Sequence, residues 1–353
     1  MYKIILFFLF TISSFAQKTE NVILITLDGF RWQEVFTGAD SSLINDKQYT
    51  HHPDQLRETF WNDDFKERRK ALMPFMWNTI AKKGQLFGNS DFGNDVIVKN
   101  GKFFSYPGYN EILTGYPDPN VDSNDKINNT NETVLEFVNK QKGFEGKVAA
   151  FGSWDVFPFI INEERSGVPV NAGFESQHIT NSTQEKLLNE LQMQVPELWS
   201  TVRFDAFTHQ FAKEYLAEKT PRLLYIAYGE TDDFAHDGAY DSYLKSGRQT
   251  DAFIKDLWEW TQSQEQYKDK TTLIIASDHG RGTIPKDTWR SHGDDIDGAD
   301  HIWLAAIGPD VKPLGELKSK GVIYQNQIAS TVAKLLGMKF QNGKEIGVPL
   351  DFK

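Results

Sequence analysis

The sequence predicts an α/β fold built on a doubly wound, largely parallel β-sheet flanked by helices on both faces. Several runs are apolar without polar alternation, as expected of strands that are buried on both faces of a sheet. These runs alternate with helical segments, which is the sequence sign of such a sheet. The clearest run, 272–277, ends in Asp278-His279-Gly280. In open α/β sheets the chemistry gathers where strands end at their carboxyl edge.

The composition is typical of one large globular domain. The chain has 353 residues, of which 39% are hydrophobic and 25% are charged. We expect a single catalytic domain over residues 17–353, with insertions near 37–70 and 155–200 that cover the site. The net charge of −11 argues against binding of nucleic-acid polymers or anionic membranes. An anionic substrate would need a local positive centre, which a divalent metal would provide.

The N-terminus predicts export. Lys3 is followed by the apolar run 4–10 and then by small residues up to Ala16, which is the pattern of a signal peptide over residues 1–16. The run is shorter than the roughly 18–20 residues of a membrane-spanning helix, so no stable membrane anchor is expected. The sequence has no cysteine, so a metal would be held by histidine and carboxylate ligands. We therefore expect a periplasmic or secreted protein.

The expected elements can be listed in chain order. The apolar runs predict strands at 21–27, 85–88, 96–104, 147–152, 221–228, 272–277 and 302–309. Periodic apolar residues predict helices near 71–83, 109–114, 133–142, 184–191, 204–218, 240–264 and 327–336. Five strands would end at Asp28, Ser105, Ser153, Glu230 and Asp278, so these residues can converge on one edge of the sheet.

Ser105 follows an apolar segment, and Tyr106-Pro107-Gly108 then turns the chain into a short helix. A hydroxyl at such a junction faces the free N–H groups of a helix N-terminus, which favour an anion. That arrangement suits a nucleophile that attacks a phosphate or sulfate ester. An ordinary helix-capping serine is the alternative.

Four other segments carry candidate metal ligands. Asp28-Gly29 ends the first strand, although Asp-Gly is also a common turn. Asp232 and His236 are four residues apart, so one helical turn would bring them to the same face. Asp278-His279 offers an oxygen and an imidazole side by side, with a helix cap and a surface histidine as the alternative. His292 follows in a loop.

Together these residues form two groups of three protein ligands with a hydroxyl between them. One group is Asp232, His236 and His292; the other is Asp28, Asp278 and His279. Each group leaves a coordination position open, as catalytic zinc sites do. No histidine or lysine base is evident directly beside Ser105, so activation of its hydroxyl by a metal is the simplest proposal.

The ordered set resembles the alkaline phosphatase superfamily, especially its nucleotide pyrophosphatase/phosphodiesterase branch. The matching segments are Leu27-Asp28-Gly29, Ser105-Tyr-Pro, Thr114-Gly115, Asp232-x-x-x-His236, Ser277-Asp278-His279-Gly280 and His292-Gly293, spanning 22–309 with Ala306-Ile-Gly-Pro309. The resemblance implies two Zn²⁺ ions, with other divalent metals left open. It also implies that Ser105 is a metal ligand and the nucleophile of a covalent phosphoserine intermediate, and that Asn128 or Asn129 contacts the phosphate.

Departures from the family pattern bear on the substrate. Ser105 stands where the phosphodiesterase branch commonly has threonine. The segment at Ser153-Trp154-Asp155 lacks the Lys-x-Arg pair that some phosphatases use for a terminal phosphate. Ser105-Tyr-Pro-Gly-Tyr109 lacks the arginine of a sulfatase signature. We therefore expect a phosphodiesterase or pyrophosphatase acting on a small phosphoester. A phosphomonoesterase or phosphonate hydrolase is the alternative, and a sulfatase or a non-catalytic surface-binding protein ranks below it. The sequence leaves the oligomeric state open.

Overall fold

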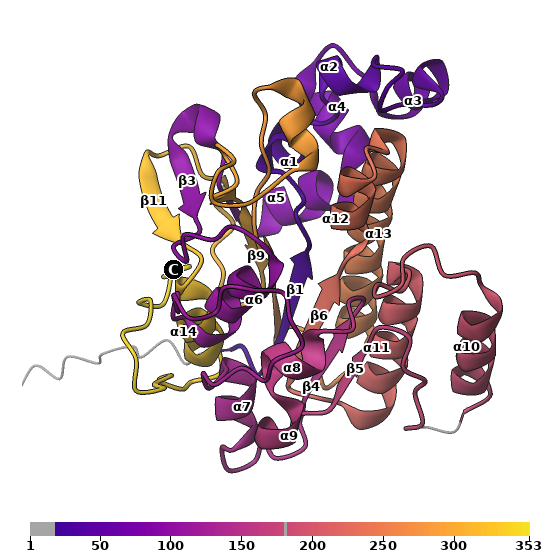
Figure 1. Ribbon diagram of the computed structural model, residues 1–353. Coiled ribbons are helices and arrows are strands. Elements are labelled where there is room, and N and C mark those ends of the chain that lie inside the picture. The colour runs from indigo at the N-terminus through magenta and orange to yellow at the C-terminus, as the bar shows by residue number, and fades with distance from the viewer. Residues whose placement is uncertain (1–17, 180–181) are drawn as a thin grey trace, which may run out of the picture.

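A computed structural model describes residues 18–179 and 182–353 (Figure 1). The expected signal peptide, residues 1–16, lies outside the described residues. Within them, no helix is long and apolar enough to cross a lipid bilayer.

The core of the molecule is an eight-stranded sheet. Across the described part of the chain, seven of its strands run in one direction and β9 runs against them. The spatial order is β10 (Gly315–Glu316), β2 (Gln85–Phe87), β9 (Leu304–Ile307), β7 (Thr271–Ser277), β1 (Asn21–Leu27), β6 (Leu223–Tyr228), β4 (Val148–Gly152) and β5 (Val170–Ala172). The central strands β1, β6 and β7 are buried along their whole length, as their unbroken apolar runs predict.

Helices cover both faces of this sheet, which confirms the predicted doubly wound α/β class (Figure 1). One face packs against α1 (Trp32–Thr37), α2 (Ser41–Ile44), α3 (Pro53–Phe60), α4 (Phe65–Leu72), α11 (Asp205–Lys219), α12 (Glu230–His236) and α13 (Tyr240–Ser263). The other packs against α6 (Ser105–Thr114), α7 (Val134–Asn139), α8 (Phe157–Ile161) and α14 (Gln327–Leu335). Adjacent β1 residues alternate between the two cores: Ile23 and Ile25 face one, and Val22 and Leu24 face the other.

One local expectation needs correction. The segment before Ser105 was expected to be a strand of the main sheet, but β3 (Asn94–Ile97) belongs to a separate sheet with β8 (His301–Ile302) and β11 (Gly321–Tyr324). The chain then turns at residues 99–101, where Glu111 accepts hydrogen bonds from two backbone N–H groups. Residues 37–70, the first expected insertion, form α2 to α4.

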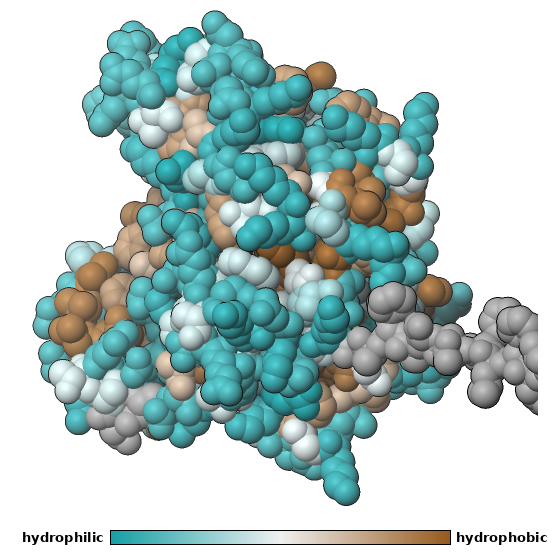
Figure 2. Space-filling view, turned by 180° about the vertical axis from the view of Figure 1, so that it is seen from behind, coloured by the Kyte–Doolittle hydropathy of each residue, from teal (hydrophilic) through white to brown (hydrophobic). Residues whose placement is uncertain are grey.

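The second insertion, near 155–200, contains α8, α9 (Glu163–Ser166), β5 and α10 (Thr183–Gln194). Helix α10 packs on α11 and projects from the body of the protein (Figure 1). Figure 2 shows hydrophobic side chains gathered over this region on the back face, and the exposed ones here are Leu187, Leu191, Met193, Val195 and Leu198.

Candidate active site

The candidate ligands converge because three parallel strands end level with one another. Leu27 of β1 is paired with Tyr228 of β6 on one side and with Ser277 of β7 on the other. The residues that follow these strands therefore leave the sheet at the same edge. Asp28 and Asp278 come directly after their strands, and α12 begins two residues after β6.

The inner cluster consists of Ser105, Asp28, Asp278 and His279, arranged around one nitrogen. His279 Nε2 lies 3.2 Å from Asp28 Oδ1, 3.5 Å from Asp278 Oδ2 and 3.4 Å from Ser105 Oγ. Ligand atoms around a tetrahedral zinc ion are about 3.3 Å apart, because each lies about 2.0–2.1 Å from the metal. The spacing in this cluster therefore fits one tetrahedral metal ion.

The remaining atoms of these residues support the same assignment. Asp28 Oδ2 accepts from the Tyr109 hydroxyl at 2.8 Å, and Asp278 Oδ1 accepts from the Gly29 N–H at 3.0 Å. His279 Nδ1 lies 3.0 Å from Gly280 O, so it donates there and leaves Nε2 as the free ligand atom. Asp28 Oδ1 and Asp278 Oδ2 are buried without a hydrogen-bond partner in the described structure. Each side chain thus offers the cluster an atom that the protein does not otherwise use.

Burial makes these carboxylates unfavourable as free anions. Desolvation raises the pKa of Asp28 well above its usual range, and the nearby Asp232 carboxylate adds to this. Desolvation, followed by repulsion from Asp28, raises the pKa of Asp278 in the same direction. Such carboxyl groups are stabilised in their ionised form by a cation bound between them.

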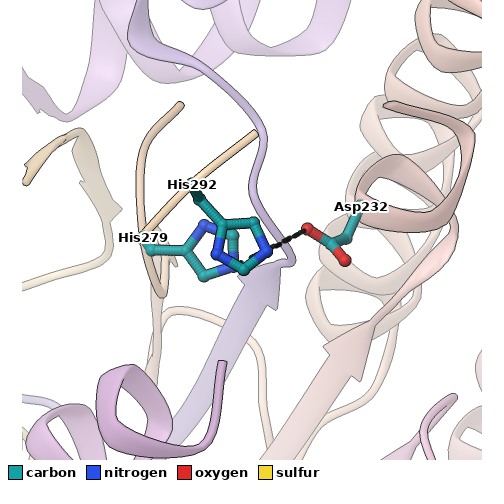
Figure 3. A group of neighbouring side chains, drawn as sticks. All are labelled: Asp232, His279 and His292. Carbon is teal, nitrogen blue, oxygen red and sulfur yellow. Dashed lines mark ion pairs between the residues drawn. The ribbon is translucent and has the colours of Figure 1, made fainter. Parts of the chain in front are cut away.

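The outer cluster is formed by Asp232, His236 and His292. His236 Nε2 lies 3.2 Å from Asp232 Oδ2 and 3.0 Å from His292 Nε2. Asp232 and His236 lie on α12, so the expected sharing of one helical face is confirmed. Figure 3 shows the His279 and His292 rings side by side, 4.0 Å apart between centroids, both facing Asp232. The two clusters therefore adjoin through these rings.

The charge states of the outer cluster suit a metal. Desolvation, followed by the neighbouring His279, lowers the pKa of His292 to about 2, so its imidazole is neutral at physiological pH. Burial opposes ionisation of Asp232, but Arg281, His236 and His292 outweigh it and hold the pKa of this carboxyl well below its usual range. Neutral imidazoles and an ionised carboxylate are the forms that bind metals.

Arg281 is a part of the site that the sequence analysis did not identify. Its Nε donates to Gly29 O at 3.0 Å and its Nη1 to Arg290 O at 2.8 Å. Its Nη2 donates to Asp232 O at 3.2 Å and forms an ion pair with Asp232 Oδ1. The glycine after Asp28 gives this guanidinium room, because a Cβ at Gly29 would lie 2.8 Å from Arg281 Nε.

We expect Gly29→Ala to destabilise the fold and to displace Arg281. Gly29 has a φ of +55°, which costs an alanine about 1–2 kcal/mol, and the clash with the guanidinium adds about 1–3 kcal/mol. Urea unfolding of both variants measures this, with Gly101→Ala as the control. Gly101 has a φ of +69° and nothing within 4 Å of its added Cβ, so it reports the backbone cost alone. Equal losses in the two variants would contradict the clash.

Ser105 is held against the inner cluster by its own helix. It is the first residue of α6 and is buried, and Phe104 is the helix cap, so Ser105 is not the capping serine considered above. Gly108 allows the close contact, since a Cβ there would lie 2.5 Å from Asp278 O. The hydroxyl therefore lies both at the N-terminus of α6 and beside the candidate metal ligands.

The asparagine predictions fare differently. Asn129 is buried and does not present its amide to the site: Nδ2 donates to Asn110 Oδ1 and Ile160 O, and Oδ1 accepts from the Asn131 N–H. Asn128 is exposed, and Asn124 is the asparagine beside the nucleophile, where its Oδ1 accepts from the Tyr106 N–H at 3.0 Å. The sequence could not single out Asn124, because this loop is rich in asparagine.

A family model described as type I phosphodiesterase / nucleotide pyrophosphatase matches residues 45–336, most of the chain. This chain belongs to that family. The matched range includes every candidate ligand except Asp28, which precedes it. No curated protein matches this sequence. Membership makes the chain a phosphoester hydrolase of a metal-dependent family.

Solved structures share the fold of this chain. Wild-type alkaline phosphatase PafA is 12% identical, with a TM-score of 0.58 over 94% of this chain and 98% of that chain. The lipoteichoic acid synthase LtaP from Listeria monocytogenes is 12% identical, with a TM-score of 0.58 over 96% and 76%. The phosphonate monoester hydrolase of Agrobacterium radiobacter is 14% identical, with a TM-score of 0.55 over 90% and 74%.

Proposed function

We propose that this protein is an exported phosphodiesterase or nucleotide pyrophosphatase that uses two Zn²⁺ ions and a covalent phosphoserine on Ser105. The observation that carries the proposal is the inner cluster, in which the Ser105 hydroxyl lies 3.4 Å from His279 Nε2 and beside two carboxylate oxygens without protein partners. A binding protein without catalysis would have no need for a hydroxyl at this point. Export is supported by the sequence of residues 1–16.

The residues that would hold the metals divide as the two clusters do. The inner cluster supplies Asp28, Asp278, His279 and Ser105, and the outer cluster supplies Asp232, His236 and His292. When bound, divalent metals would lower the pKa of the serine hydroxyl, neutralise the phosphate and stabilise the leaving oxygen.

The chain itself positions the reacting groups. Ser105 Oγ forms a bond to phosphorus as the bond from phosphorus to the leaving oxygen breaks, and water then hydrolyses the phosphoserine and restores Ser105. The Ser105 N–H at the start of α6 would face the phosphate oxygens, since the Tyr106 N–H is bonded to Asn124 and Pro107 has no N–H. Asn124, hydrogen-bonded to the Tyr106 N–H, would place its amide nitrogen near the same oxygens.

The expected diester preference rests on charge. A phosphomonoester is a dianion and gains more from extra cations than a diester does. Lys126 reaches the segment after β4, but its Nζ lies 2.7 Å from Asp155 Oδ2, so this carboxylate offsets its charge. The same lysine is the observation that favours the alternative, a phosphomonoesterase or phosphonate hydrolase on this fold, because a phosphate could compete with Asp155 for it.

A substrate comparison tests this function. The zinc-loaded protein is assayed on bis-p-nitrophenyl phosphate, p-nitrophenyl phosphate and a nucleotide pyrophosphate. We expect kcat/KM to be higher on the diester and the pyrophosphate than on the monoester. A preference for the monoester that Lys126→Ala abolishes would establish the alternative instead. No turnover on any of the three by the zinc-loaded protein would refute both.

We expect Asn124→Ala to lower kcat/KM by about 10- to 100-fold, because a hydrogen bond to a charged group contributes about 1.5–3 kcal/mol. Asn128→Ala is the matched control, since it removes an exposed amide from the same loop. We expect it to leave kcat/KM within twofold to threefold of the wild type, as is usual for surface changes of about 0.5 kcal/mol. A larger loss of kcat/KM in Asn128→Ala than in Asn124→Ala would instead assign the phosphate contact to Asn128.

A further inference from the structure

Arg281 connects the segments that carry the metal ligands of both clusters. It is 1% exposed and follows the Asp278-His279-Gly280 turn. Its three nitrogens contact the residue after Asp28, the ligand Asp232 and the residue two positions before His292. In the described structure its ion pair is with Asp232. One side chain therefore joins three ligand-bearing segments that are far apart in the sequence.

The two oxygens of Asp232 have different surroundings. Asp232 Oδ2 lies 3.2 Å from His236 Nε2, within the outer cluster. Asp232 Oδ1 is paired with the Arg281 guanidinium and lies farther from the two remaining imidazoles, at 3.6 Å from His279 Nε2 and 3.7 Å from His292 Nε2. A carboxylate with one oxygen held by arginine has a single oxygen to give fully to a metal.

We propose that Arg281 is a positioning residue that restricts Asp232 to one metal–oxygen contact and so keeps a coordination position open in the outer cluster. The inference rests on the proposed two-metal function. A catalytic metal site needs such an open position for a substrate or water oxygen. If Asp232 turned both oxygens to the metal, the second oxygen would add a ligand to the three, and a substrate or water oxygen would then be the fifth ligand rather than the fourth.

The geometry explains why the residue is arginine. The planar guanidinium directs its donors along fixed directions, so it can contact Gly29 O, Arg290 O and Asp232 at once. A lysine would supply the charge through a single nitrogen and could not brace all three segments. Arg290 connects a further ligand-bearing residue, because its own side chain donates to His236 O at 2.6 Å.

The experiment uses Co²⁺ as the probe in the full-length protein. The visible absorption of Co²⁺ is strong in four-coordinate sites and weaker at higher coordination numbers. We expect Arg281→Met to keep two cobalt ions per chain, to absorb less per cobalt and to lose activity by about 10- to 100-fold. Arg281→Lys should recover part of the absorption, because the cation can still pair with Asp232.

Lys286→Met is the matched control. Lys286 lies in the same loop, but it pairs with Asp46 at the surface, so the cobalt spectrum should match the wild type. An Arg281→Met spectrum equal to that of the wild type, with two cobalt ions bound, would overturn the assignment of Arg281. If Arg281→Met fails to fold, Arg281→Gln decides, because it is polar but has no cation to hold Asp232 Oδ1: an unchanged spectrum overturns the proposal, and a weaker one supports it. Wild-type protein that binds no cobalt would refute the two-metal function itself.

Discussion

Replacing Ser105 by alanine is expected to abolish phosphoester turnover, by on the order of 10⁴-fold or more, while the protein stays folded and keeps its metals. The large loss follows because the substitution removes the atom that forms the covalent intermediate. Metal retention follows because Asp28, Asp278 and His279 still supply three ligands to the inner cluster. Steady-state kinetics and metal analysis of the purified variant measure the two effects.

Two further variants sharpen this result. Ser105→Thr keeps a hydroxyl and should retain measurable turnover and a trapped phosphoenzyme in acid-quenched samples. Ser153→Ala removes a different buried serine, which follows β4 and donates to Asp205 at 2.6 Å. It should cost about 1 kcal/mol of stability and leave turnover largely intact. Undiminished activity in Ser105→Ala would remove Ser105 from the mechanism.

Replacing His279 by alanine is expected to have the second largest effect. His279 Nε2 is the atom around which the inner cluster is spaced, and it also lies 3.6 Å from Asp232 Oδ1. Its loss should release a metal ion and reduce turnover by about 10³-fold, as removal of strong electrostatic stabilisation of a transition state does. Metal stoichiometry and kcat of the variant measure both effects.

Chelation offers an independent check on His279. A chelator should lower the Tm of the wild type, because removal of the metal leaves the buried Asp28 and Asp278 uncompensated. It should shift the Tm of His279→Ala much less. His301→Ala is the control, since the His301 side chain is partly exposed and pairs with Asp300. Two metals and full activity in His279→Ala would contradict the ligand assignment.

The sequence was most informative where the same short segment predicts both a secondary-structure element and a candidate metal ligand. The runs ending at Asp28 and Asp278 predicted buried parallel strands and a shared sheet edge, and the register of β1 with β7 explains why their carboxylates meet. The spacing of Asp232 and His236 predicted one helical turn, which α12 provides. Local patterns are sufficient for such features because strand ends and helical turns are set by neighbouring residues.

The sequence was least informative where a role depends on distant partners. Arg281 directly follows a recognised motif. However, Gly29 and Asp232, which accept hydrogen bonds from its guanidinium, are 252 and 49 residues away in the sequence. Asn124 stands among several asparagines, and it is singled out only by the Tyr106 N–H. Ser105 was placed at the end of a strand because the preceding segment is apolar, but the turn at 99–101 makes it the start of a helix.

The central position of β1 has a consequence for how the protein folds. This strand comes first in the described chain, but its neighbours in the sheet are β6 and β7, about 200 and 250 residues later. During synthesis β1 therefore cannot pair with its neighbouring strands until most of the chain has been made. Contacts of such long range form slowly. Asp28 meets Asp278 and His279 only when β7 has docked. Acquisition of a metal by the inner cluster would then report that the sheet is complete.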